Sequence, residues 1–206
     1  ISERLGLPTV LENDANLMAL GLRREHPDVG SFVFVKIATG IGAGIVVAGR
    51  LHTGVAGLAG EIGHIPVRSG GDRQCSCGNR GCLADQAAVP ALLRKLSSGG
   101  RSIGDLAELQ ALVTSGDGEA VAALRSAGRD IGEALVGVVT AIAPEVLILG
   151  GRLTQLGDHL TTGVRESLTR HALPALSSRI RVTTTTKHRT AGLRGGAELA
   201  FDHLLA

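Results

Sequence analysis

The feature that most constrains this chain is GEIGHIPVRSGGDRQCSCGNRGC, residues 60–82, which holds all three of its cysteines. The thiols of Cys75, Cys77 and Cys82, together with the imidazole of His64, are the ligand set of a closed tetrahedral zinc site. Disulfide bonding or simple burial of the cysteines is the alternative interpretation. Because three is an odd number and a reducing compartment disfavours disulfides, we predict a structural zinc ion in this loop.

The composition indicates a soluble globular protein. Of the 206 residues 44% are hydrophobic, which is enough to fill a core, and the formal net charge is only +2 with no basic stripe. The apolar run Val146–Leu149 is far shorter than the roughly 20 residues that cross a bilayer. We therefore expect a cytoplasmic protein without a membrane partner. Because the chain begins with Ile1, we interpret it as a fragment of a longer gene product.

Patterns along the chain predict an α/β fold with a partly parallel sheet, because strands alternate with helices in its second half. Strands are expected at 7–11, 31–37, 44–48, 145–151 and 180–185. The turn ATGIGAG at 38–44 should join two of them as a β-hairpin. Helices are expected at 15–25, 83–96, 103–113, 118–142, 157–171 and 196–205.

Four motifs resemble the ROK family, which contains bacterial sugar kinases and sugar-responsive repressors. They are ENDAN at 12–16, TGIGAGIV at 39–46, GLAGEIGH at 57–64 and CSCGNRGC at 75–82. The resemblance implies an actin-like, hexokinase-like (ribonuclease H-like) ATPase fold, in which two α/β lobes enclose a sugar and a nucleotide. It implies that residues 1–30 end the first lobe and that residues 31–206 form the second, with its zinc loop at 64–82. A homodimer is also expected from the family.

The resemblance assigns a sugar-binding role to four side chains. Asp14 would be the catalytic base that accepts the proton of the attacking sugar hydroxyl, and Asn13 would hydrogen-bond a neighbouring hydroxyl. Without the surrounding motif, an ordinary helix N-cap would be the simpler interpretation of Asp14. Glu61 and His64 would face the sugar from the second lobe. One ring nitrogen of His64 could bind zinc while the other reaches a hydroxyl.

A nucleotide, ATP with Mg²⁺, is the possible second ligand that the family implies. Thr39, Gly40 and Gly42 would form the turn that faces its phosphates, with glycines letting backbone N–H groups approach the anion. A tight hairpin without a ligand is the alternative. Gly150 and Gly151 would lie near the adenosine.

The chain departs from the family pattern at three places. Ala84 stands where active members carry a sugar-binding Glu, with Asp85 one position later. Ala38 replaces a glycine of the phosphate turn, and Leu22 stands where Glu is frequent. These changes favour the sugar-binding effector domain of a ROK-type transcription regulator, which would contact DNA only through an upstream domain absent from this chain. An ATP-dependent, glucokinase-like hexose kinase is the alternative, although this fragment alone should be inactive.

Overall fold

The computed structural model describes residues 2–98 and 101–205, and within them five strands form one sheet. The strands are β1 (Phe32–Ile37), β2 (Ile41–Val47), β3 (Arg50–His52), β4 (Val146–Gly150) and β5 (Arg181–Thr185). Their order in the sheet is β3-β2-β1-β4-β5. β2 pairs antiparallel with β1 and β3, whereas β4 is parallel to β1 and β5. The partly parallel sheet and a β1–β2 hairpin are confirmed. The turn is shorter than the predicted 38–44, because residues 41–44 belong to β2 and pair with β1.

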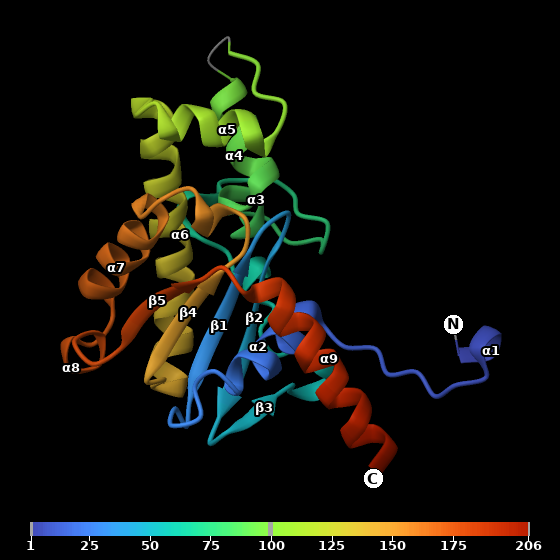
Figure 1. The fold of residues 1–206 in the computed structure, drawn as a ribbon. Helices are drawn as coiled ribbons and strands as arrows, with labels where there is room; N and C mark the ends of the chain where they lie inside the picture. Colours follow the sequence, from blue (N-terminus) through green and yellow to red (C-terminus); the bar gives the residue numbers. More distant parts are fainter. Residues whose placement is uncertain (1, 99–100, 206) are drawn as a thin grey trace.

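Helices cover both faces of this sheet (Figure 1). The longer ones are α2 (Asp14–Arg23), α4 (Val89–Ser97), α5 (Leu106–Thr114), α6 (Gly118–Ile142), α7 (His159–His171) and α9 (His188–Leu205). The short ones are α1 (Ser2–Leu5), α3 (Ala84–Ala87) and α8 (Pro174–Ser177), and 3₁₀ turns occupy Val55–Gly57, Ile62–His64, Arg68–Gly70 and Leu153–Gln155. Among the described helices, none is both long and apolar enough to span a bilayer.

The central strand β1 is buried on both faces, because its sequence FVFVKI places apolar side chains at successive positions. Val33 and Val35 belong to a core that also contains residues of α6 and α7. Phe32 and Phe34 belong to a second core, shared with residues of α2 and α9. A strand with two apolar faces is typical of a parallel sheet between two helical layers. The three parallel strands β1, β4 and β5 therefore end at one edge of the sheet.

The helices α2 and α9 pack very closely because glycines lie between them. A Cβ atom built on Gly195 would lie 1.8 Å from the carbonyl oxygen of Leu17, and one on Gly21 would lie 1.9 Å from that of Ala191. Neither position can therefore carry a larger side chain without moving a helix. Gly195 and Gly196 thus lie inside α9.

Ion pairs hold the same two helices together. The carboxylate of Glu198 on α9 is buried and accepts hydrogen bonds from Arg23 and Arg24, the latter at 2.9 Å from Nε to Oε2. Glu25 accepts from Lys187 at 3.4 Å and from Arg194 at 3.2 Å. A buried carboxylate without such partners would be strongly destabilising. The position of α2, whose first turn carries the candidate sugar-binding residues, is therefore fixed by α9.

The strand expected at 7–11 is wrong. These residues have no regular secondary structure, and Leu11 is 97% exposed. An apolar run forms a strand only where a neighbouring strand pairs with its backbone groups, and no described strand pairs with this one. The sequence pattern alone does not contain that information.

Two helix boundaries also differ from the expectation. The helix expected at 83–96 is divided into α3 and α4 at Ala88, whose backbone is extended, with Pro90 in the first turn of α4. Pro90 has no N–H to donate to the carbonyl oxygen of Gln86, and its ring would clash with that carbonyl in a continuous helix, which favours such a break. The last helix begins at His188 and not near residue 196.

We predict that Gly195→Ala lowers the free energy of unfolding by about 1–3 kcal/mol, because its methyl group would overlap the backbone of α2. Gly196→Ala is the matched control, since the nearest atom to its new Cβ is a side-chain carbon of Leu17 at 4.0 Å. It should instead stabilise the helix by up to about 1 kcal/mol. Urea unfolding followed by circular dichroism measures both, and equal effects of the two substitutions would contradict the packing described.

Candidate functional site

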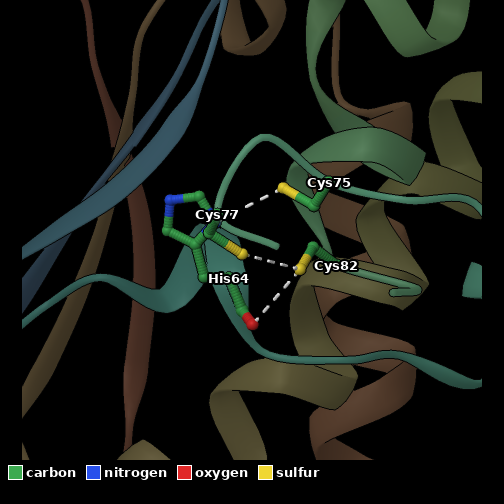
Figure 2. Close-up of side chains that lie close together, drawn as sticks. All are labelled: His64, Cys75, Cys77 and Cys82. Carbon is green, nitrogen blue, oxygen red and sulfur yellow. Dashed lines mark hydrogen bonds between the residues drawn. The ribbon is translucent and has the colours of Figure 1, made fainter. Parts of the chain in front are cut away.

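The predicted zinc ligands converge in the structure (Figure 2). One ligand atom from each of His64, Cys75, Cys77 and Cys82 lies within 4.8 Å of the others. The sulfurs of Cys77 and Cys82 are 3.7 Å apart, and the sulfur of Cys75 is 3.5 Å from Nδ1 of His64. Zinc–sulfur bonds of about 2.3 Å in a tetrahedron separate two sulfurs by about 3.7 Å. These residues can therefore hold a zinc ion.

Two of the thiols have pKa values shifted in opposite directions. Burial raises the pKa of Cys82 to about 12, whereas a hydrogen bond from the backbone of Asn79 lowers the pKa of Cys77. All three cysteines are free thiols, so the disulfide alternative is not realised. A bound metal would displace the proton of Cys82 and compensate the buried thiolate charge.

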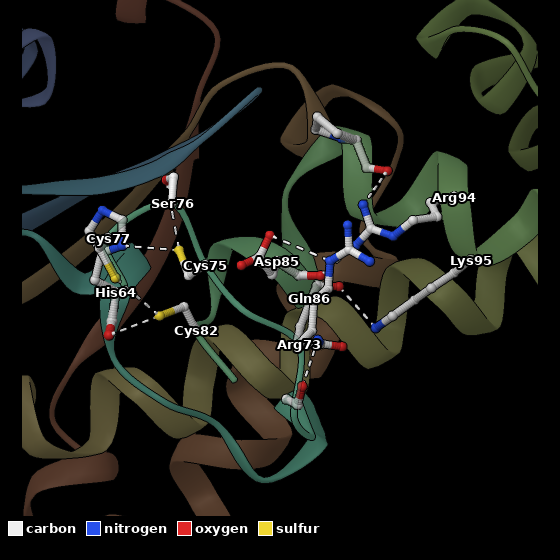
Figure 3. Close-up of polar contacts among 12 residues, drawn as sticks. His64, Arg73, Cys75, Ser76, Cys77, Cys82, Asp85, Gln86, Arg94 and Lys95 are labelled. Carbon is white, nitrogen blue, oxygen red and sulfur yellow. Dashed lines mark hydrogen bonds and ion pairs between the residues drawn. The ribbon is translucent and has the colours of Figure 1, made fainter. Parts of the chain in front are cut away.

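Hydrogen bonds connect the cysteine loop, residues 64–82, to helix α3, and α3 to helix α4 (Figure 3). The side-chain amide of Gln86 donates to the carbonyl oxygen of Gly70 at 3.2 Å, and Lys95 donates to the carbonyl oxygen of Gln86 at 3.0 Å. Arg94 donates to the carbonyl oxygen of Asp85 at 2.8 Å. Because only Leu83 separates Cys82 from the start of α3, these bonds connect the ligand cluster to the helical layer.

The loop also connects to the first turn of α2 through a row of polar side chains. Nδ1 of His64 faces the thiol of Cys75, and its Nε2 is 3.8 Å from Oε2 of Glu61. The other oxygen of Glu61 accepts a hydrogen bond from Nδ2 of Asn13 at 3.2 Å. Asn13 is itself the N-cap of α2, because its Oδ1 accepts the N–H of Ala15. Three of the predicted sugar-binding residues are thus brought together.

Asp14 is the first residue of α2, so the N-cap interpretation applies to Asn13 instead. Its carboxylate accepts a hydrogen bond from Nζ of Lys36 at 2.5 Å. Lys36 lies on β1, and sequence reasoning missed it. The available signal was one charged residue inside an otherwise apolar strand.

The residues predicted to face a nucleotide phosphate do not share one cavity. Thr39 and Gly40 line a cavity of about 260 Å³ together with His64 and Ala84, which we call the loop cavity. Gly42 lies on β2, opposite Lys36 in the sheet. Neither glycine has a positive φ, so nothing in the local backbone requires glycine at Gly40.

The pair Gly150 and Gly151 has a packing role at the end of β4. A Cβ on Gly150 would lie 2.6 Å from the ring of Phe34, and one on Gly151 would lie 2.2 Å from the carbonyl oxygen of Ile37. Gly151 also has φ +114°, a value that L side chains rarely adopt. The adenosine role of these glycines stays a prediction.

A second cavity, of about 610 Å³, lies at the carboxyl ends of the parallel strands, and we call it the basic cavity. Its lining residues come from α2, from the end of β1 and the residue after it, from the segment after β4, and from the start of α9. It is lined by Asp14, Met18, Lys36, Ala38, Gly151, Arg152, Gln155, His188 and Arg189. Crevices at this edge of an α/β sheet are the usual ligand sites. Sequence reasoning missed its arginines and His188.

The departures from the family pattern occupy different environments. Ala84 lines the loop cavity next to Asp85, and Ala38 lines the basic cavity. The methyl group of Ala84 offers no hydrogen bond to a ligand there. Leu22 is completely buried in the core between α2 and the sheet, where a Glu would need a partner.

The family assignment follows from residues 1–203, which match the model of the ROK family. The chain belongs to the ROK family. Among curated relatives, the glucokinase of Halalkalibacterium halodurans is 28% identical over 97% of this chain and 65% of its own length. The xylose repressor of Bacillus spizizenii is 27% identical over the whole chain and 53% of its own length. The chain thus spans about half to two thirds of these ROK relatives.

Solved ROK structures share the fold. A ROK family transcriptional regulator, a homolog of the E. coli MLC protein, superposes with a TM-score of 0.85 at 27% identity, covering 95% of this chain and 52% of that chain. A ROK family glucokinase from Streptomyces griseus, in complex with glucose and AMPPNP, superposes with a TM-score of 0.82 at 28% identity. The superposition covers 96% of this chain and 70% of that chain. Kinases and regulators are both relatives of this ROK chain.

We predict that Cys82→Ala reduces the zinc content of this ROK protein from one ion per chain to near zero. Because the binding free energy of a structural zinc, about 10–16 kcal/mol, becomes folding free energy of its loop, amides of residues 64–82 should then exchange rapidly with deuterium. Metal analysis and hydrogen exchange measure these effects. Ser76→Ala is the control, since Ser76 lies between two ligands but supplies none. Clean, reduced wild-type protein without zinc would contradict the site.

Proposed function

We propose that this chain is the sugar-binding effector domain of a ROK-family transcription regulator. The sugar would be held by a row of four polar side chains that begins at α2 and ends at the cysteine loop: Asn13, Asp14, Glu61 and His64. Zinc would act structurally by fixing the position of His64 and, through it, the arrangement of these four side chains. DNA would be contacted by a separate domain, and the working form would be a homodimer.

The observation that carries this proposal is the ion pair between Asp14 and Lys36. A kinase needs this carboxylate to accept a proton from the sugar hydroxyl that attacks the phosphate. Here one carboxylate oxygen already accepts a charge-assisted hydrogen bond from the ammonium group at 2.5 Å. The ammonium group therefore competes with a sugar hydroxyl for the carboxylate, although the second carboxylate oxygen can still accept a hydrogen bond.

Sugar recognition does not require a free base. The Glu61 carboxylate and the Asn13 amide offer acceptors and donors whether or not Asp14 is paired, and hydroxyl groups can bridge them. A sugar that binds one arrangement of the two lobes more tightly than another would shift the population between them. That shift is how a sensor would pass its signal to DNA.

An ATP-dependent hexose kinase is the second candidate function. The residues Asn13, Asp14 and Glu61 are all present, and they support it together with the likeness to the S. griseus glucokinase. In this case Thr39, Gly40 and Gly42 would hold the phosphates of ATP·Mg²⁺, and Gly150 and Gly151 would lie near the adenosine.

We predict that the full-length protein carrying this chain binds sugar without consuming ATP. Glucose and xylose, the sugars named in its relatives, should be tested as ligands by thermal unfolding and in a coupled assay with ATP.

Glu61→Gln should weaken sugar binding about 5- to 150-fold, because a buried hydrogen bond to a polar ligand is worth about 1–3 kcal/mol.

The control for that substitution is Glu119→Gln, a change at an exposed residue in the first turn of α6 that lines neither cavity. It should leave sugar binding unchanged. ATP turnover that depends on sugar and disappears in Asp14→Asn would contradict the sensor and establish the kinase.

A further inference from the structure

Asp130 is a buried carboxyl group that none of the roles described so far uses. It lies on α6, only 6% of the residue is exposed, and its Oδ2 is buried without a hydrogen-bond partner among the described residues. It lines neither the loop cavity nor the basic cavity. A buried carboxyl group with an unpaired oxygen costs free energy that an apolar side chain would not. The elements packed against Asp130 therefore indicate what it does.

The base of the cysteine loop, the 3₁₀ turn Arg68–Gly70, is packed against Asp130. The side chain of Ser69 in this turn hydrogen-bonds the Asp130 carboxyl group. Three residues further along α6, Oε1 of Glu133 accepts the backbone N–H of Arg68 at 3.3 Å and lies 3.4 Å from its Nε. Residues three apart share one face of a helix, so α6 presents two carboxyl groups to two successive residues of the turn.

Helices α3 and α4 are connected to the same turn through Gln86 and Lys95, both drawn in Figure 3. Nε2 of the buried Gln86 donates to the carbonyl oxygen of Gly70 at 3.2 Å, and Nζ of Lys95 donates to the carbonyl oxygen of Gln86 at 3.0 Å. The ammonium charge of Lys95 also favours the ionised form of Asp130. Polar contacts thus fix the turn to α3 and α6, and Lys95 joins α4 to both.

The position of this turn determines where one zinc ligand lies. The N–H of Val67 donates to the carbonyl oxygen of Gly81 at 3.0 Å, and Gly81 directly precedes Cys82. A Cβ atom built on Gly70 would lie 2.2 Å from that same oxygen. Pro66 and Cys82 also form an isolated β-bridge. The backbone of the turn therefore lies directly against the backbone next to Cys82, and a shift of the turn would move the ligand.

Charged groups from the elements around Asp130 act on its carboxyl group in both directions. Burial raises the pKa of Asp130, whereas the hydrogen bond from Ser69 and the charges of Lys95 and Arg129 lower it in part, and the charge of Glu133 raises it further. Removing this carboxyl group would therefore relieve the cost of its burial and release the turn at the same time. Its effects on the fold and on the loop can for this reason be measured separately.

We propose that Asp130 and Glu133 form a carboxylate clamp that positions the base of the cysteine loop on α6 and slows the release of its zinc ion. Both are positioning residues, since they act through the turn and not as metal ligands. The inference goes beyond sugar binding, because it concerns the retention of the metal. It rests on the zinc site predicted for the loop.

The test is the rate at which the zinc-loaded full-length protein loses its metal to an excess of a chromophoric chelator. The double substitution Asp130→Ala, Glu133→Ala removes both acceptors and should speed release about 10- to 100-fold, because two hydrogen bonds to the turn are lost. Amides of residues 68–82 should then exchange faster with deuterium, whereas those of β1 and β4 should keep their protection.

The conservative double substitution Asp130→Asn, Glu133→Gln keeps an acceptor oxygen at each position and removes both charges. It should restore most of the wild-type behaviour, with release only about two- to fivefold faster, because bonds to neutral acceptors are weaker than those to charged ones. A loss of buried volume alone would not be rescued by retaining the acceptor oxygens.

Glu133→Ala alone keeps the test decisive if the double alanine variant does not fold, because the Glu133 side chain is 32% exposed. It should speed release about three- to tenfold. Glu119→Ala is the matched control, since it removes an exposed carboxyl group from the first turn of the same helix, and it should change nothing.

Three results would overturn the inference. The first is a wild-type rate of zinc release in Glu133→Ala and in the double alanine variant. The second is an equal loss of amide protection in the loop and in β1 and β4, which would mean that the two carboxyl groups support the whole fold. The third is wild-type protein that binds no added zinc, which would also remove the metal site. Sugar binding is not measured here, so these results are independent of the proposed function.

Discussion

Three parallel strands end at one edge of the sheet, and the arrangement of the candidate site depends on that edge. β1 supplies Lys36 near its end, β4 runs into Gly151, and the chain after β5 enters α9 at His188. Helix α2 is the fourth element that contributes residues to this edge, and it can lie against β2 because Gly44 has no side chain. A Cβ there would be 2.5 Å from the carbonyl oxygen of Ala15. Backbone packing thus brings Asp14 to the strand ends.

The cysteine loop, residues 64–82, depends on a different physical constraint. Most of residues 68–80 are exposed polar or glycine residues, so the loop has little apolar surface to bury. Its order must come from hydrogen bonds to α3 and from the ligand cluster. Three sulfurs and an imidazole this close together are compatible with thiolate charge only if a cation lies among them. Because His64 belongs to the cluster and its Nε2 lies 3.8 Å from Glu61, which in turn accepts a hydrogen bond from Asn13, the cluster is mechanically connected to the first turn of α2.

The sequence was most informative where the chemistry of single residues decides the outcome. Cys75, Cys77, Cys82 and His64 could be assigned to one cluster because few other functions use that ligand set. The hairpin, the long α6 and the apolar β4 followed from periodicity. The strand at 7–11 failed because pairing depends on a neighbour that periodicity does not reveal. The lobe boundary near residue 30 stays a prediction.

Lys36, Arg152 and His188 could not be predicted from the sequence, because each acquires meaning only from tertiary neighbours. Lys36 is an ordinary charged residue until β1 places it beside Asp14. The lysine then changes what the cavity can recognise. An unpaired carboxylate would repel an anion, whereas the ion pair with the ammonium group of Lys36 removes that repulsion. One side chain on a strand can therefore change the charge that a cavity presents to a ligand without any change in the fold.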